Sequence, residues 1–306
     1  MDTIQLNIDP TGQWDKLTVT QFEIKFKQLY EILTRNLDGV FTEYHNVEGH
    51  SVTVPVMESF VLGDRGAFSS VVPNQSVNIG RISFDLTVKA AKAPIDIVLE
   101  KEIKANIVSS LAQQAAGAVK RCEDQFVIDA LKDAATAHDA DISKAGADEG
   151  KKTAAKEKNM NVIEVTKANA FKIDHLIEAK VLMDRIGIPA DNRHFAAPAS
   201  LQKNLLLTNQ VTSTDYAAVK ALVFGEINQF LGFKFHWIPN MPEGGMTDGV
   251  AYAFHQNDGA QAWGVSSRIE MYYDNPTMSN IIQAMVHGSA KVLIPKNMVC
   301  IKYNTQ

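Results

Sequence analysis

Residues 102–137 read EIKANIVSSLAQQAAGAVKRCEDQFVIDALKDAATA. Apolar side chains recur in this stretch every three or four residues, a spacing typical of an amphipathic helix. They are Ile103, Ile107, Leu111, Ala115, Ala118, Cys122, Phe126, Ala130 and Ala134. Because no proline interrupts the pattern, we expect one helix roughly 50 Å long. Such a helix would be a rigid strut across the molecule, and two shorter helices broken near Gly117 are the alternative.

In the chain before this helix, apolar residues recur at every second position. Val52, Val54 and Val56 alternate with other residues, and the same alternation returns from Ile82 to Val88. The pattern predicts a long antiparallel excursion over residues 42–89, with an exposed turn at residues 62–67. A two-stranded hairpin alone is marginally stable in water, so we expect it to lie against something else, and on a neighbouring subunit if its own chain offers no surface. Replacing Val54 and Val56 by Asp should then block assembly and leave folding largely intact.

Helices and strands alternate in the middle of the chain, and strands dominate both ends, which indicates an α+β protein. A polar arm is expected before residue 19, and a solvated, charged and mobile insertion at residues 138–158. A stripe of Ala170, Ile173, Ile177 and Val181 predicts the buried face of a helix. Expected helices cover residues 19–37, 169–186, 198–207 and 216–223. Expected strands cover residues 194–197, 226–238, 249–254, 269–273, 281–287 and 292–303.

Composition excludes several classes of protein. The chain has 306 residues, of which 45% are apolar, a formal net charge of −5 and a pI near 5.9. These values are typical of a globular protein. They argue against a protein whose main function is to bind DNA through a basic surface. No apolar run is long enough to cross a bilayer, and the N-terminus lacks the pattern of a secretory signal. Two cysteines, Cys122 and Cys300, are too few for a disulfide framework and fit a reducing cytosol.

The search for chemistry finds no phosphate-binding loop, dinucleotide fingerprint or common hydrolase or zinc motif. The weak candidates have simpler interpretations as surface or core residues. They are a metal set of Glu43, His45, Glu48 and His50, a His175–Glu178 pair, an Asp139–Asp141 cation site, and a base-stacking group of Phe230, Phe233, Phe235 and Trp237. We therefore expect no catalytic residue, no metal and no cofactor, and a structural role becomes the leading class.

The order of arm, hairpin, long helix, α/β region and terminal strands resembles the major capsid proteins of tailed bacteriophages, which have the Hong Kong 97-like fold. In detail it is most similar to the capsid proteins of short-tailed podophages. The resemblance covers roughly residues 20–303. The segments that carry it are GHSVTVPV at residues 49–56, PNQSV at 73–77, LAQQAAGA at 111–118, LGFKFHWIP at 231–239, and IIQAMVHG at 281–288 followed by residues 292–302.

The resemblance implies a chain that assembles as pentamers and hexamers into an icosahedral head shell enclosing double-stranded DNA without sequence-specific binding. It also implies a portal and a separate scaffolding protein as partners, no membrane, assembly in the host cytoplasm and a final place in the virion. The implied domains are an N-terminal arm (1–41), an E-loop (42–92), a peripheral domain with the spine helix and the charged insertion (93–160), an axial domain (161–264), and C-terminal strands of the peripheral domain (265–306).

The resemblance also assigns roles to individual residues. The E-loop would contact the neighbouring copy through Val52, Val54, Val56, Gly63, Asp64, Arg65 and Gly66; the axial tip would be Met241, Pro242, Glu243, Gly244 and Gly245; the core of the spine helix would be Ile107, Leu111, Ala115, Cys122 and Phe126. Two rival functions remain at this stage. One is an encapsulin-type compartment with the same fold and a protein cargo, and the other is a metal-dependent or nucleotide-using enzyme with an unrecognised site.

Overall fold

The computed structural model describes residues 35–57, 79–97, 107–145, 148, 159–165, 171–207, 229–265 and 267–303. The chain forms two compact units. Unit 1 comprises residues 1–35, 88–122 and 267–286, and unit 2 comprises residues 36–87, 123–266 and 287–306. Helix α2 (Ile107–Ala145) and strand β12 (Ser279–Val292) each contribute one part to unit 1 and the other part to unit 2.

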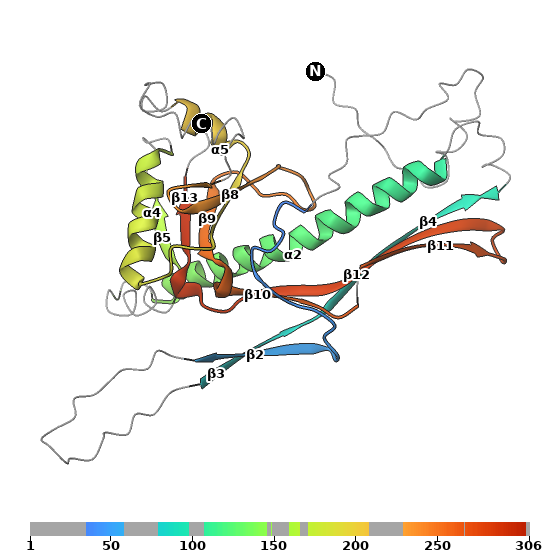
Figure 1. The fold of residues 1–306 in the computed structure, drawn as a ribbon, viewed down its shortest axis with the longest axis horizontal. Coiled ribbons are helices and arrows are strands. Elements are labelled where there is room, and N and C mark those ends of the chain that lie inside the picture. Colours follow the sequence, from blue (N-terminus) through green and yellow to red (C-terminus); the bar gives the residue numbers. More distant parts are fainter. Residues whose placement is uncertain are drawn as a thin grey trace, which may run out of the picture. The chain divides into compact units, whose positions relative to one another are not determined.

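A mixed six-stranded sheet organises unit 2 (Figure 1). Its strands, in spatial order, are β5 (Asn161–Glu164), β13 (Val299–Lys302), β9 (Val250–His255), β6 (Arg193–Pro198), β8 (Phe233–Ile238) and β7 (Gln229–Phe230). Strands β5 and β13 are parallel, as are β6 and β8, whereas β9 runs antiparallel to both β13 and β6. The last strand of the chain therefore completes the sheet of the α/β region instead of joining the other C-terminal strands.

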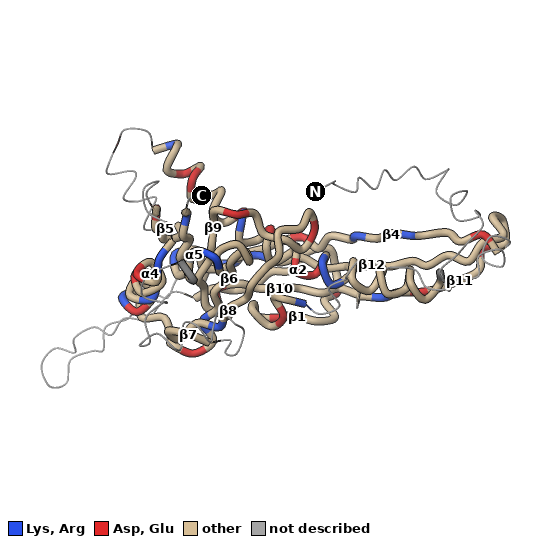
Figure 2. Tube along the Cα trace, turned by 90° about the horizontal axis from the view of Figure 1, so that it is seen from above, with Lys and Arg blue, Asp and Glu red and all other residues tan. Residues whose placement is uncertain are grey.

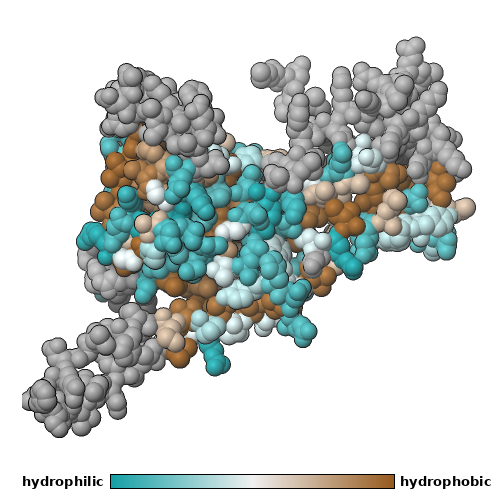
Figure 3. Space-filling view, viewed as in Figure 1, coloured by the Kyte–Doolittle hydropathy of each residue, from teal (hydrophilic) through white to brown (hydrophobic). Residues whose placement is uncertain are grey.

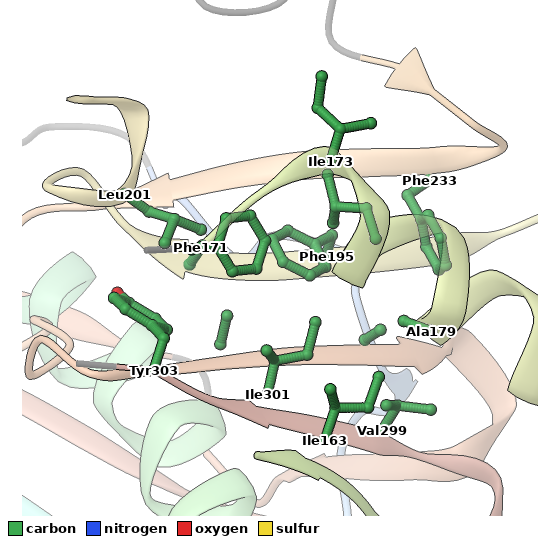
Figure 4. Packing of buried hydrophobic residues seen from close by; sticks show 14 of the residues in the cluster. Ile163, Phe171, Ile173, Ala179, Phe195, Leu201, Phe233, Val299, Ile301 and Tyr303 are labelled. Carbon is green, nitrogen blue, oxygen red and sulfur yellow. The ribbon is translucent and has the colours of Figure 1, made fainter. Parts of the chain in front are cut away.

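Helix α4 (Ile173–Ile186) packs on one face of this sheet (Figure 4). The buried side chains of the helix are Ile173, Leu176, Ala179 and Met183. They meet Phe195, Phe233, Val299 and Ile301 from the strands, with Leu201 from α5 (Leu201–Leu207) at the edge. The predicted stripe was wrong in part, since Ile177 and Val181 are 44% and 49% exposed. The true stripe begins at the same Ile173 and follows the steps to Leu176 and Met183, because the sheet lies on that side.

The second half of α2 packs on the opposite face. Successive residues of a strand point to opposite sides, so Phe195 faces α4 whereas Ala196 faces α2. Val127, Ile128 and Leu131 of α2 form a core with strand residues Ala196, Ile238, Tyr252, Phe254 and Cys300. Leu37, Val40 and Phe41, which precede the first strand, fill the same core and are fully buried. Unit 2 is thus a helix, sheet and helix sandwich closed by this N-terminal segment.

Helix α2 is longer than predicted at its C-terminal end and unbroken. It passes through Gly117 without interruption, which excludes the alternative of two helices, and it continues to Ala145. The expectation of a mobile insertion from residue 138 was therefore wrong for its first eight residues. His138 is buried, and Lys302 of β13 forms a 2.7 Å ion pair with Asp139. Tertiary contacts hold this alanine-rich turn of helix although it has few large apolar side chains.

A second set of strands extends unit 2. Strand β1 (Thr42–Tyr44) pairs in parallel with β10 (Gly259–Trp263), which pairs antiparallel with the C-terminal end of β12. Strands β2 (Ser51–Met57) and β3 (Ile79–Asp85) form a separate antiparallel hairpin, as predicted. Short 3₁₀ turns at Gln256–Asp258 and Pro295–Asn297 connect β9 to β10 and β12 to β13, so the expected strand 292–303 is broken at Pro295.

Unit 1 is built from extended strands and the first half of α2. Strand β4 (Thr87–Asp96) and strand β11 (Arg268–Asp274) both pair with β12. Ile95 and Ile282 of this sheet pack against Val108, Leu111 and Ala115 of α2. Within the described residues, no helix is long and apolar enough to span a membrane.

The expected strand 226–238 was wrong in one respect. Leu231 and Gly232 have φ angles of +53° and +87°, and they turn the chain between β7 and β8. Two successive positive φ values define the tight turn that suits a two-residue hairpin. Leu37, the expected end of the first helix, lies in a bend. Arg35 and Asn36 before it are not helical either, so the expected helix was wrong for these last residues. Residues 19–34 of that helix, the helix at 216–223 and the turn at 62–67 lie outside the described residues.

Candidate assembly surfaces

The base of the β2–β3 hairpin belongs to its own chain. Val52 and Val54 of β2 and Phe84 of β3 are buried in one core cluster with Leu86. Ala260, Ala262 and Leu293 of unit 2 complete that cluster. The expectation that Val54 lies away from the core was therefore wrong, because the chain supplies the apolar surface that covers this face of the hairpin. Val56, one step nearer the hairpin end, is only partly buried.

Backbone hydrogen bonds fix the same base. The amide of Val47 donates to the carbonyl of Trp263 at 3.0 Å, and the amide of Leu86 donates to the carbonyl of His50 at 2.8 Å. The hydroxyl of Thr87 donates to the carbonyl of Gly288 at 3.1 Å. The bonds of Val47 and Thr87 attach the hairpin base to strands β10 and β12, and the bond of Leu86 to His50 joins the two sides of the hairpin. The direction in which the hairpin leaves unit 2 is therefore set by unit 2 itself.

Burial is lost along the hairpin away from this base. Met57 and Ile79 are paired across the two strands in the last described register, and they are 67% and 60% exposed. Apolar surface is visible at this end of β2 and β3 in the space-filling view (Figure 3). The predicted contact residues Gly63, Asp64, Arg65 and Gly66 lie outside the described residues. The hairpin therefore carries exposed apolar side chains at the end remote from its anchor.

Strand β11 of unit 1 is a second exposed surface. Among the described strands it pairs with β12 alone, and six of its seven residues are exposed. Exposed large apolar side chains gather on it and on the turn after it: Ile269, Met271, Tyr272, Tyr273 and Met278. A long edge strand of this composition offers unpaired backbone groups and apolar contact to another chain. Contact of such an apolar strand with water does not stabilise a monomer.

The glycine-rich loop at residues 239–249 is only partly a surface tip. Pro242 and Glu243 are exposed, as predicted for the axial tip, but Gly244 and Gly245 are buried. The amide of Gly244 donates to the side-chain carbonyl of Gln125 on α2 at 2.8 Å. A Cβ on Gly245 would clash with the backbone of Met241, so only glycine fits. The prediction was wrong for these two glycines, because the loop folds back onto the helix.

Gln125→Ala should release this loop without unfolding the chain. The change leaves the buried amide of Gly244 without its acceptor, at a cost of about 1–3 kcal/mol. We expect faster hydrogen exchange in residues 241–246 and a modest drop in the midpoint of chemical denaturation. Gln113→Ala, an exposed glutamine on the same helix, should change neither quantity. Unchanged exchange in the Gln125→Ala loop would show that this hydrogen bond does not hold it.

The predicted core of the spine helix is divided between the two units. Leu111 and Ala115 pack on the sheet of unit 1, as described above. Cys122 is buried and is not part of a disulfide. Phe126 is buried in unit 2 and lies edge-on to Trp263 at a ring-centroid distance of 6.2 Å. The side chain of Ile107 lies outside the described residues. The helix is therefore a shared structural element of both units.

The residues considered for chemistry have structural positions. The imidazole of His45 lies 3.2 Å from the carboxylate of Glu43 on the surface. The ring of His175 accepts a hydrogen bond from the amide of Lys172 and so caps α4. Asp141 accepts a hydrogen bond from Asn159. Among the described residues, no group of three His, Cys, Asp or Glu side chains is arranged to hold a metal ion.

The aromatic group is core, as interpreted from the sequence. Phe233 and Phe235 are buried in the cluster under α4, and Phe230 and Trp237 pack against it.

A pair of histidines on the other face of the same sheet was not expected from the sequence. His194 and His236 lie on the neighbouring parallel strands β6 and β8, with their ring centroids 5.2 Å apart. Only the pairing of β6 with β8 brings them together, so no local sequence signal could have revealed the pair.

Comparison with known proteins agrees with this architecture. A family model described as "Phage capsid protein" matches residues 15–305. The chain therefore belongs to the phage capsid protein family. No curated protein matches it.

Solved capsid structures share the fold at low sequence identity. The capsid of cyanophage P-SCSP1u matches with a TM-score of 0.71 and 14% identity, over 95% of this chain and 94% of that one. The mature capsid of bacteriophage PhiM1 matches with a TM-score of 0.64 and 14% identity, over 94% and 92%. The capsid of Ralstonia phage GP4 matches with a TM-score of 0.61 and 10% identity, over 100% and 99%.

The expected fold class is confirmed as the Hong Kong 97-like capsid fold. The family makes the chain a structural protein of the phage particle, a major capsid protein of the head shell, and not an enzyme. The same match favours a phage head over a compartment for protein cargo. As expected for the fold, the protein carries its function in surfaces that meet other copies.

Proposed function

We propose that the chain assembles as pentamers and hexamers into an icosahedral shell around double-stranded DNA, and that residues 42–92 act as an E-loop overlapping an adjacent copy. Residues 161–264 would form the axial domain, with Pro242 and Glu243 as the exposed part of its tip. Residues 93–160 and 265–306 would form the peripheral domain, except that β13 and the second half of α2 complete the α/β sandwich of the axial strands. Assembly would take place in the host cytoplasm with a separate scaffolding protein and a portal.

The observation that carries this proposal is the gradient of burial along the hairpin. Its base is packed on its own unit, whereas Met57 and Ile79 at the other end are largely exposed. Two apolar side chains paired on an isolated two-stranded ribbon gain little stability in water. Covering them with a neighbouring copy would bury apolar area, which stabilises the contact by about 25 cal/mol per Å². A closed shell repeats this contact in every copy.

A receiving surface of suitable character is the exposed edge strand β11. It presents apolar and aromatic side chains together with a surface ion pair between Arg268 and Glu270 at 3.3 Å. Aromatic residues and methionine are enriched where proteins meet, and charged residues suit the rim. We propose that β11 takes part in the contact between copies, since both it and the hairpin end are apolar surfaces that a lone chain leaves in water.

The charge of the chain fits a container. The formal net charge is −5, and in the described part of the chain lysines and arginines lie among acidic residues, as on α4 (Figure 2). A strongly basic lining would bind packed DNA through the release of counterions and hinder its movement. We propose that the genome is enclosed without sequence-specific contacts.

The proposal can be tested by introducing two negative charges in the last described, exposed register of the hairpin. The double variant Met57→Asp with Ile79→Asp should fold like the wild type but yield no shells, because carboxylates would be buried in the contact between copies. Sedimentation velocity and electron microscopy would measure assembly, and circular dichroism with thermal melting would measure folding. We expect a loss of shells of more than tenfold at equal protein concentration.

A matched control adds the same two charges elsewhere. Ala137 and Ala140 are exposed on α2, so Ala137→Asp with Ala140→Asp should assemble normally. Normal shells from the hairpin variant would refute a contact at this end of the E-loop. Loss of folded protein in that variant would instead show that Met57 and Ile79 pack within their own chain, which would also refute the proposal.

A further inference from the structure

Two buried histidines form a direct hydrogen bond in unit 2. Nδ1 of His194 on β6 lies 2.9 Å from Nε2 of His236 on β8. Nδ1 of His236 in turn lies 2.7 Å from the backbone carbonyl oxygen of Asn36. Because a carbonyl can only accept, Nδ1 of His236 carries a proton. In the neutral pair, Nε2 of His236 is therefore the acceptor and Nδ1–H of His194 is the donor.

The same backbone segment is held on its other side by helix α2. The carboxylate of Asp124 accepts hydrogen bonds from the amides of Asn36 and Leu37, at 2.8 and 3.1 Å. Residues 36 and 37 are thus gripped between the helix and the sheet. The buried side chains of Leu37, Val40 and Phe41 belong to the same segment and pack in the core of unit 2.

The histidine pair has positive or basic neighbours. Lys234 lies on β8 and His255 on β9, and both oppose a positive charge on His194. Phe254 stacks on the ring of His194 at a centroid distance of 5.9 Å. The acids of the adjoining part of α2 are Glu123 and Asp124; the carboxylate of Asp124 is bonded to the two amides. Arg35 directly precedes the gripped residues in the chain. The buried Asp258 accepts a hydrogen bond from the amide of His255.

We propose that His194, His236, Asn36 and Asp124 form an acid-sensitive latch that holds residues 36–41 in the core of unit 2. The latch is closed while both imidazoles are neutral, and acidification opens it. This inference concerns a single folded chain and does not depend on the shell geometry proposed above.

Protonation acts against the closed latch in two ways. A first proton places a positive charge in a buried site beside Lys234, and burial disfavours such a charge. With both rings charged, each of the two facing nitrogens carries a proton, so the hydrogen bond between the rings is lost. Consistent with this, burial lowers the pKa of His194 from 6.5 to about 3, and burial also lowers the pKa of His236.

The sign of the pH dependence follows from these directions. Both pKa values are lower in the closed state than in an open, hydrated state, so the open state binds more protons below pH 6.5. The latch is therefore most stable above that pH and weakens as the pH falls from 6.5 toward 3. For His194 alone, the opening equilibrium should rise roughly 30-fold between pH 7.5 and pH 5.

Hydrogen–deuterium exchange of the full-length protein tests the proposal. Protection of the amides in residues 36–41, corrected for the intrinsic pH dependence of exchange, should fall by roughly 30-fold or more between pH 7.5 and pH 5. Peptides of α4, on the far face of the sheet, should keep their protection. An equal loss in α4 would indicate general unfolding and would overturn the proposal, as would constant protection of residues 36–41.

Variants of the two histidines separate the latch from other acid effects. The double variant His194→Gln with His236→Gln keeps neutral donors and acceptors, so its protection of residues 36–41 should be the same at both pH values. Each single variant should reduce the pH dependence of the protection of residues 36–41. If the double variant does not fold, the single variants provide the test. His50→Gln, at an exposed histidine, should retain the full wild-type dependence. A double variant that still responds to acid like the wild type would overturn the proposal.

Discussion

Val54→Asp is expected to prevent the chain from folding rather than to affect assembly alone. Val54 is only 7% exposed, and its neighbours in the core cluster are apolar side chains from β3, β10 and the segment after β12. A carboxylate there would have to be buried without a partner or would force the hairpin off unit 2. Burial of an uncompensated charge costs about 3–5 kcal/mol, a large part of the stability of a typical domain.

The neighbouring residue provides the control. Thr53 lies on the exposed face of the same strand, where its hydroxyl is 2.9 Å from that of Ser83. Thr53→Asp should therefore yield soluble protein with a nearly unchanged melting temperature, whereas Val54→Asp should accumulate in the insoluble fraction or melt far below the wild type. Equal melting temperatures for the two variants would mean that the hairpin base is not packed on its own chain.

Phe41→Ala should have a comparable effect on stability at a different place. The ring of Phe41 is fully buried, and it lies edge-on to Phe254 at a centroid distance of 5.3 Å. It also covers Gly259, where a Cβ would lie 2.5 Å from the ring. Removing a buried phenylalanine ring typically costs about 3–5 kcal/mol. The measurement is the free energy of unfolding in urea at neutral pH.

Tyr44→Ala is the matched control for Phe41→Ala, because Tyr44 is an exposed aromatic residue three positions later on the same segment. It should change the unfolding free energy by less than about 1 kcal/mol. A small effect of Phe41→Ala, similar to that of Tyr44→Ala, would show that the N-terminal segment is not part of the core of unit 2.

The structure redefines the hairpin as a structural element. The resemblance implied a ribbon that lies over another copy of the chain. The structure shows a base anchored on its own chain, held by apolar packing, by a backbone bond to β10 and by the bond of the Thr87 hydroxyl to β12, with exposed apolar residues farther along. A rigid base is an advantage in a shell protein, since it fixes the direction of the extension before a neighbour is met and so reduces the entropy lost on assembly.

Much of the secondary structure could be predicted from local pattern. The alternation of Val52, Val54 and Val56 correctly predicted a strand, and the long helical period correctly predicted α2. Gly187, with a φ of +83°, ends α4 where expected. Local periodicity works in these cases because side-chain direction follows directly from the backbone geometry of a helix or strand.

Prediction from the sequence failed where burial depends on which face of an element another element packs against. Ile177 and Val181 are spaced like core residues yet are exposed, because the sheet lies against the side of α4 that carries Leu176 and Met183. The alanine-rich residues 138–145 have the composition of a solvated segment, but they are helical, with His138 buried and Asp139 paired with Lys302 of β13. The resemblance implied a surface tip at residues 241–245, although the hydrogen bond to Gln125 holds Gly244 against α2.

By itself, the sequence determined the class of the chain: an α+β protein with a hairpin, a long helix and terminal strands, whose ordered elements match a capsid protein. The tertiary structure alone decided which faces are covered within the chain, and it brought His194 beside His236 and β13 beside β5. The physical reason is that backbone periodicity is a local property. Burial and the pairing of distant strands depend instead on which segments meet in space, and nothing in a local pattern specifies that.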